Sequence, residues 1–150
     1  MHYKLFGKSG LRVSELALGT MTFGNKNGDG VADKIVSRKL FDAFLKAGGN
    51  FMLWVHMWDS VTLIEEVMRG LDALIRSGKV LYIGVSDYPA WVVSQANTLA
   101  ELRNCTPFVA LQIEYSLIQR TPERELLPMA QGFGLTITPW SVLGAGLLTG

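Results

Sequence analysis

Residues Gly48–Ser60, GGNFMLWVHMWDS, determine how the rest of the chain can be organised. Five apolar residues stand in a row over Phe51–Val55, between a glycine pair and a polar loop. An uninterrupted apolar run between turn signals is typical of a parallel strand that is covered on both faces. We therefore predict a buried strand over Phe51–His56. Its last residue, His56, is expected to be buried at the carboxyl end, where parallel α/β sheets place their chemistry.

A single histidine at the end of an apolar strand has two interpretations. It is more often a structural hydrogen-bonding group than a catalyst, so this stretch alone leaves both roles of His56 open.

Further candidate strands begin near residues 80, 109 and 135, so strands recur every 26 to 29 residues from residue 51 onward. Segments with helical apolar stripes lie between them, and this alternation predicts βα units with a parallel sheet. About four and a half units are present, whereas a closed barrel of this type needs eight units and about 250 residues. We predict one α/β domain over residues 1–150, an incomplete (β/α) TIM-type barrel with about five parallel strands.

Local signals set the expected boundaries. A hairpin is expected over Tyr3–Phe6 and Arg12–Val13, and another short strand over Leu16–Thr20. The first helix is expected to have its N-cap at Asp33 and to stop at Gly48, and the second to begin with a capping box of Thr62 and Glu65. A third helix is expected to have Pro89 in its first turn. A fourth is expected to begin at Thr121, to be kinked by Pro128 and to end at Gly134. The predicted inward faces are Val36, Leu40, Phe41, Phe44 and Leu45; Leu63, Val67, Leu71, Leu74 and Ile75; and Trp91, Val92, Ala96 and Leu99.

The composition excludes several classes of partner. Fourteen basic residues against 13 acidic ones give no electrostatic footprint for nucleic acid or for a membrane surface. One cysteine, Cys105, excludes an internal disulfide and suits a reducing compartment, and we expect no metal site. The N-terminus has no apolar signal core, so a cytoplasmic protein is expected. A hydrophobic fraction of 49% is high for a small monomer and indicates contact with another subunit.

Five blocks of sequence resemble one known family in the same order. They are LFGKSGLRVSELALGTMTFG (Leu5–Gly24), WVHMWD (Trp54–Asp59), SGKVLYIGVSD (Ser77–Asp87), LQIEYSLIQR (Leu111–Arg120) and TPWSVLGAGLLTG (Thr138–Gly150). Together they are similar to the aldo-keto reductases, (β/α)₈ barrels that use NADPH.

The resemblance implies a hydride-transfer site of four side chains: Asp, Tyr, Lys and His. His56 matches the histidine, which holds and polarises the carbonyl of a small substrate. The other three have no match, because Phe51 is followed directly by what resembles the end of the family's fourth strand. The chain thus resembles a shortened family member, with an internal deletion and without the later C-terminal part. We expect it to be weakly active or inactive, with Tyr88 the nearest candidate for a replacement donor.

The resemblance also implies a cofactor side. Ser86, Asp87 and Gln112 would face the nicotinamide carboxamide, where the family often has Ser-Asn in place of Ser-Asp. Trp140 matches the aromatic residue that stacks on the nicotinamide ring. The residues matching the loop beside the pyrophosphate are Ser141, Leu143 and Gly144. The segment that grips the 2′-phosphate is absent from these residues, so weak or lost NADPH binding is expected.

Three functions compete at this point. The first is an impaired NADPH-linked carbonyl reductase, and the second is a non-catalytic oligomeric module for binding or assembly. A third is new chemistry, such as hydrolysis, at His56 with Asp59. Open strand edges recruit partners, so a homo-oligomer, most simply a dimer, is expected.

Overall fold

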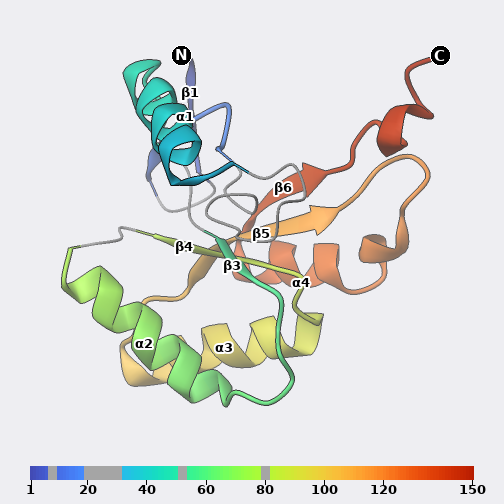
Figure 1. Cartoon of the computed structure of the whole chain (residues 1–150). Coiled ribbons are helices and arrows are strands. Elements are labelled where there is room, and N and C mark those ends of the chain that lie inside the picture. The colour runs from blue at the N-terminus through green and yellow to red at the C-terminus, as the bar shows by residue number, and fades with distance from the viewer. Residues whose placement is uncertain (7–9, 19–31, 51–53, 79–81) are drawn as a thin grey trace. The chain divides into compact units, whose positions relative to one another are not determined.

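The computed structural model describes residues 1–6, 10–18, 32–50, 54–78 and 82–150 (Figure 1). The chain divides into two compact units, residues 1–6 with 10–52 and residues 7–9 with 53–150. We call them the N-terminal unit and the C-terminal unit. Among the described residues, no helix has the length and apolar character needed to cross a membrane.

The N-terminal unit contains a hairpin and one helix. Strands β1 (Tyr3–Leu5) and β2 (Arg12–Ser14) pair antiparallel, which confirms the predicted hairpin. Helix α1 (Lys34–Lys46) begins after Asp33, whose side chain accepts a hydrogen bond from the Val36 N–H at 2.8 Å. The predicted N-cap is therefore confirmed, and satisfying this free helical N–H stabilises the first turn.

The predicted inward face of α1 is wrong in part. Val36, Leu40 and Leu45 are all exposed, whereas Ser37 is the buried residue of the helix. The spacing of apolar residues in α1 correctly predicted a helix. It did not predict which side of the helix is buried in this unit.

The C-terminal unit is built on a four-stranded parallel sheet. Its strands run in the order β3 (Trp54–His56), β4 (Ile83–Ser86), β5 (Phe108–Glu114) and β6 (Thr136–Trp140). This arrangement confirms the α/β class and agrees with an incomplete TIM-type barrel. The described residues contain four parallel strands where about five were expected. Residues 16–18 form no strand, and residues 19, 20 and 51–53 of the predicted strands lie outside the described part.

Three α-helices connect or follow the strands of this unit: α2 (Ile64–Arg76), α3 (Ala90–Arg103) and α4 (Leu126–Phe133). Short 3₁₀ turns, η1 (Thr121–Glu123) and η2 (Gly144–Gly146), follow β5 and β6. The helices run below the sheet in Figure 1. The sheet contributes Val85, Leu111 and Ile113 to the core, and these pack with buried residues of the helices such as Met68 and Val93. Burial of this face fixes the strand register, because a slip by one residue would turn it to the other side.

Three predicted features of the helices are wrong, one of them only in part. The N-cap of α2 is Leu63, without a side-chain cap, so Thr62 and Glu65 form no capping box. The predicted α2 face is wrong only in part: Val67, Leu71 and Ile75 pack against the core as predicted, whereas Leu63 and Leu74 are exposed. Ile64 and Met68 are buried in addition. Trp91 was predicted to point inward but is 60% exposed. It meets Trp58 edge to face, with ring centroids 5.3 Å apart, so its apolar surface is shared with a loop.

Pro128 does not kink the helix that contains it. It stands in the first turn of α4, where a missing N–H costs no helical hydrogen bond. The predicted continuous helix is instead divided between η1 and α4, and Gly134 ends α4 with a positive φ of 68°, as expected.

Candidate functional site

One row of polar side chains crosses the whole parallel sheet near its carboxyl edge. The register aligns His56 with Ser86, Ser86 with Gln112, and Gln112 with Thr138. The preceding row, Val55, Val85, Leu111 and Ile137, is apolar. Because side chains alternate along a strand, the polar row lies on the face opposite the helix-covered core. The sequence identified His56, Ser86 and Gln112 as candidate site residues but assigned no such role to Thr138.

Three of the four parallel strands are followed directly by a residue with a left-handed backbone. Met57 follows β3 with φ 67°, Asp87 follows β4 with φ 54°, and Ser141 follows β6 with φ 54°. None is glycine, and such conformations are uncommon for residues with a Cβ. Sparsely populated backbone conformations concentrate at functional sites, where they aim side chains that a regular strand would point elsewhere.

His56 faces Asp87 across the end of β3 and β4. The distance from His56 Nε2 to Asp87 Oδ2 is 3.4 Å, and the two side chains are 40% and 42% exposed. The expected burial of His56 is therefore wrong, because β3 ends at His56 and the polar edge is open. Two backbone hydrogen bonds continue the pairing of the two chain segments beyond the ends of β3 and β4. Met57 N–H donates to the Ser86 carbonyl at 3.1 Å, and Trp58 N–H donates to the Asp87 carbonyl at 3.4 Å. These bonds fix the backbones that carry both side chains.

Asp59 is committed to its own loop. Its carboxylate accepts from the Val61 and Thr62 N–H groups at 2.9 and 2.8 Å and from the Thr62 hydroxyl. The Thr62 hydroxyl and these N–H groups hold the pKa of Asp59 below its usual value. The carboxylate beside His56 is therefore that of Asp87. The third function considered above, new chemistry at His56 with Asp59, named the wrong carboxylate.

Tyr88 is buried within the hydrophobic core. Its ring lies 6.5 Å from that of Phe108, and burial, with a smaller contribution from the Asp59 charge, raises the pKa of its phenol. A core tyrosine is poorly placed to protonate a ligand at the polar row.

The polar row contains a buried group without a partner. Ser86 is fully buried, and its Oγ has no hydrogen bond among the described residues. Gln112, its neighbour on β5, has no side-chain hydrogen bond within the described part of the chain either. Buried polar groups are nearly always paired, so an unpaired hydroxyl in this row points to a polar ligand group. An amide, which both donates and accepts, fits Ser86 and Gln112, and the carboxamide of a nicotinamide has this chemistry.

The residues after β6 form a second part of this edge. Trp140 ends the strand in register with Glu114 of β5, and its side chain is partly exposed. Gly144 is buried with φ +56°, and a Cβ built there would lie 2.6 Å from Ile118 Cδ1. The positive φ favours glycine here, and a Cβ would also require the exposed Ile118 side chain to shift. Leu143 is exposed beside it, and Ser141 has the left-handed backbone described above. The four residues predicted to lie beside the cofactor therefore form one continuous turn.

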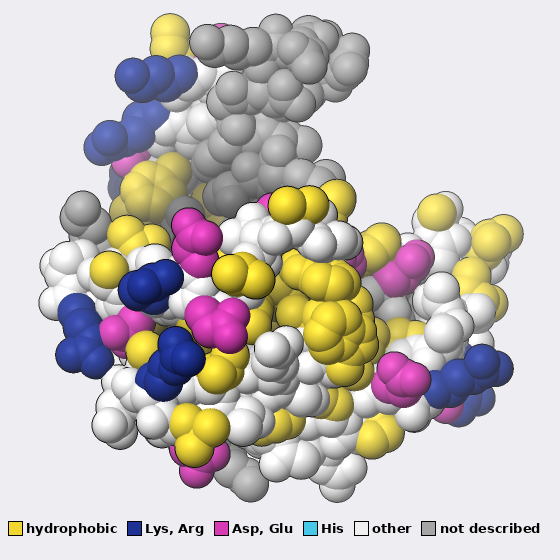
Figure 2. Space-filling model, turned by 90° about the horizontal axis from the view of Figure 1, so that it is seen from below, with side chains coloured by type: hydrophobic (Ala, Val, Ile, Leu, Met, Phe, Trp, Pro, Cys, Tyr) yellow, Lys and Arg dark blue, Asp and Glu magenta, His cyan; other side chains and the backbone are white. Residues whose placement is uncertain are grey.

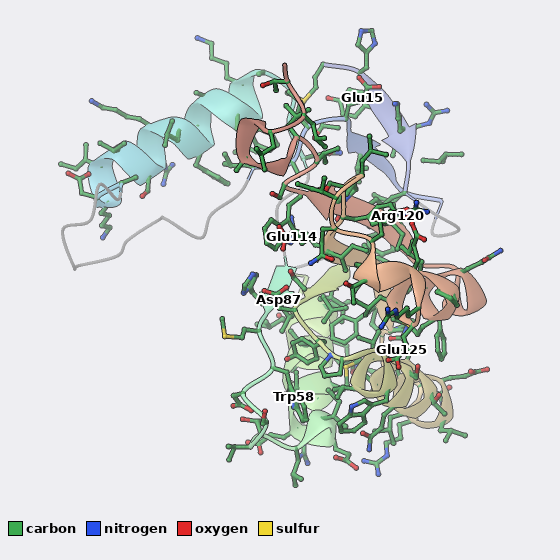
Figure 3. All side chains as sticks on the ribbon, turned by 90° about the vertical axis from the view of Figure 1, so that its right-hand side faces the viewer. Glu15, Trp58, Asp87, Glu114, Arg120 and Glu125 are labelled. Atoms are coloured by element: carbon green, nitrogen blue, oxygen red, sulfur yellow. The ribbon has the colours of Figure 1, made fainter. Side chains whose placement is uncertain are left out.

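A cleft of about 460 Å³ adjoins this edge between β4, β5 and the start of α4. Asp87, Glu114 and Glu125 contribute carboxylates to its lining, and Arg124 contributes a cation (Figure 3). Glu123 stabilises the wall of the cleft, accepting hydrogen bonds from Tyr115 and Arg120. The Arg120 guanidinium and the Tyr115 hydroxyl lower the pKa of Glu123. The cleft was not predicted from the sequence. The spacing of Arg120 and Glu123, which suits an ion pair, was the only local indication of an ordered wall there.

Comparison with known proteins gives a consistent result. Residues 52–150 match the model of the aldo/keto reductase family. Norsolorinic acid reductase of Aspergillus flavus is 32% identical over 223 residues, which cover 97% of this chain and 58% of that protein. An aryl-alcohol dehydrogenase [NADP(+)] of Phanerodontia chrysosporium is 33% identical over 227 residues, with 97% and 59% covered. A putative aryl-alcohol dehydrogenase of Saccharomyces cerevisiae is 50% identical over 95 residues, 63% of this chain and 33% of that protein. The chain thus spans less than two thirds of each of these relatives.

Proposed function

The chain belongs to the aldo/keto reductase family, and from this we propose that it is an NADPH-linked carbonyl reductase whose turnover is very weak. The observation that carries the proposal is the polar row at the carboxyl edge of the sheet. There the unpaired hydroxyl of Ser86 lies next to the amide of Gln112 and to the pair of His56 and Asp87.

The residues present fit the nicotinamide end of the cofactor. Ser86 and Gln112 would hold the carboxamide, and the partly exposed ring of Trp140 would stack on the nicotinamide. The turn residues Ser141, Leu143 and Gly144 would lie beside the pyrophosphate. When bound, NADPH supplies the hydride that reduces a carbonyl carbon. The protein would bind the carbonyl compound, orient it and provide a proton to its oxygen.

We propose that the chain lacks the family's usual proton donor. The alignment with norsolorinic acid reductase runs over 223 positions, whereas this chain has 150 residues, so at least 73 positions face no residue here. This gap supports an internal deletion that removed the catalytic Asp, Tyr and Lys together. A positioned general acid contributes typically about 10²–10⁴-fold, so its loss would make turnover very slow. Aromatic carbonyl compounds are the substrates to test first, because the relatives' names refer to aryl alcohols and norsolorinic acid.

Cofactor binding tests this function directly. Titration with NADPH should quench tryptophan fluorescence, since Trp140 would meet the nicotinamide. Ser86→Ala should weaken binding by about 2- to 10-fold, the loss of one hydrogen bond of about 0.5–1.5 kcal/mol. Ser77→Ala removes an exposed hydroxyl at the end of α2 and should leave the affinity unchanged. An absence of any response to millimolar NADPH would contradict the reductase proposal and favour a non-catalytic module.

We also propose that the chain forms a homodimer. Dimerisation is the main feature of the alternative function, a non-catalytic module for binding or assembly. Within the described residues, β3 and β6 each pair on one side only, and unpaired strand edges recruit partners. Apolar side chains also gather on the surface in Figure 2, and Val61, Leu63 and Leu102 are among the exposed ones of the C-terminal unit. Light scattering after size exclusion should give at least twice the monomer mass of 16.5 kDa. A soluble monomer at micromolar concentration would be evidence against the dimer.

A further inference from the structure

We propose that His56 and Asp87 together form the acid–base pair that delivers the proton to the carbonyl oxygen in this chain. The inference rests on the proposed function and adds to it a named proton donor and a positioning residue. It is carried by the contact of His56 Nε2 with Asp87 Oδ2 at 3.4 Å, at the carboxyl edge of the sheet.

The scaffold holds this contact from both sides. His56 is the last residue of β3, and Asp87 directly follows β4, so the two side chains start from adjacent parallel strands. The left-handed backbone at Asp87 departs from the strand's alternation and turns its carboxylate toward His56. Continued hydrogen bonding from Met57 and Trp58 keeps the two strand ends together. A surface ion pair of two flexible chains would lack this support.

No other partner among the described residues competes for either side chain. Among the described residues, the Asp87 carboxylate has no other hydrogen bond or ion pair, and His56 Nδ1 has no hydrogen-bond partner. With Nε2 facing the carboxylate, Nδ1 is the atom left to meet a ligand. The histidine is 40% exposed, so a carbonyl compound can approach it from the open edge. By contrast, Tyr88 is in the core and Asp59 is bound to its own loop.

The step balances when His56 supplies the proton and NADPH, the cofactor of the proposed function, supplies the hydride. As a hydride adds to the carbonyl carbon, the π electron pair of the C=O bond moves to oxygen. The N–H bond of the imidazolium at His56 then breaks, and an O–H bond forms to give the alcohol. The ring becomes neutral and regains a proton from solvent. Asp87 stays ionised throughout, orienting the ring and stabilising its charged form, as a carboxylate does for histidine in other acid–base pairs.

The first experiment measures a single turnover of 4-nitrobenzaldehyde by protein preloaded with NADPH. His56→Ala should slow reduction by about 10²–10⁴-fold while leaving NADPH affinity unchanged. Added imidazole should restore the rate of that variant in proportion to its concentration. Asp87→Asn keeps a polar group at this position and should still slow reduction about tenfold or more, because an amide gives no charge to support the imidazolium. His2→Ala, at the chain's other histidine, is the matched control and should react as the wild type does.

The second experiment needs no cofactor. In the ligand-free protein, the ¹⁵N signals of the His56 ring should shift in Asp87→Asn and return toward the wild-type position in Asp87→Glu. Unchanged ring signals in Asp87→Asn would overturn the pairing. A His56→Ala protein that reacts at the full rate, or that imidazole fails to rescue, would overturn the donor role, as would cofactor-loaded wild type without any reduction. A wild type that does not bind NADPH would instead overturn the proposed function and this inference with it.

Discussion

Replacing Phe108 with alanine is expected to lower the free energy of unfolding by about 3–5 kcal/mol, the usual cost of removing a buried phenylalanine. Phe108 is 1% exposed and is among the largest fully buried side chains of the described core. It opens β5 and aligns with Ile83 of β4, so the cavity would lie in the core at the start of these two strands. Urea denaturation followed by circular dichroism measures the change. The midpoint should fall, with an unchanged slope if the unfolded state stays the same.

The same substitution should reach the functional edge. The Phe108 ring supports Tyr88, which directly follows Asp87 in the β4–α3 loop. We therefore expect Phe108→Ala to loosen the contact between His56 and Asp87 as well as the core. Leu102→Ala, at an exposed position of α3, is the control and should change stability by no more than about 0.5 kcal/mol. A Phe108→Ala protein as stable as this control would contradict the central place of Phe108 in the core.

The strongly patterned parts of the fold could be predicted from the sequence. The strand expected to begin near residue 109 is β5, which begins at Phe108, because an apolar run between turn signals has few other solutions in an α/β protein. Asp33 and Gly134 lie at the helix ends where capping chemistry places them. The parallel order also followed from the alternation of strands and helices.

The parts that could not be predicted depend on contacts distant in sequence. Trp91 pairs with Trp58, and no local pattern shows that an aromatic on an apolar helix face will turn outward to a loop. The α2 face was misplaced in part for a similar reason, since the choice between Leu63 and the adjacent Ile64 depends on where the sheet lies. At the site, His56, Ser86 and Gln112 were identified as candidates, but the row that they form across the sheet depends on register. The left-handed backbones of Met57 and Asp87 have no sequence signal, because neither residue is glycine.

Asn97 should be nearly as important to stability as Phe108, although it is polar. Its side chain is 5% exposed and pairs twice with the backbone of Phe108, accepting from the N–H at 2.9 Å and donating to the carbonyl at 3.1 Å. Asn97→Ala would leave two buried backbone groups unpaired, at about 1–3 kcal/mol each, so we expect the free energy of unfolding to fall by about 2–6 kcal/mol.

The amide of Asn97 ties α3 to the first residue of β5 through these two hydrogen bonds. Asn97→Asp tests this directly, because a carboxylate accepts from the Phe108 N–H but cannot donate to its carbonyl, and it places a charge in a buried site. It should therefore destabilise the protein as well. Asn104→Gly is the matched control: Asn104 caps the same helix with a left-handed φ of 52°, which glycine adopts without strain. If urea denaturation found Asn97→Ala and Asn104→Gly equally stable, the backbone pairing of Asn97 would not be what holds α3 against β5.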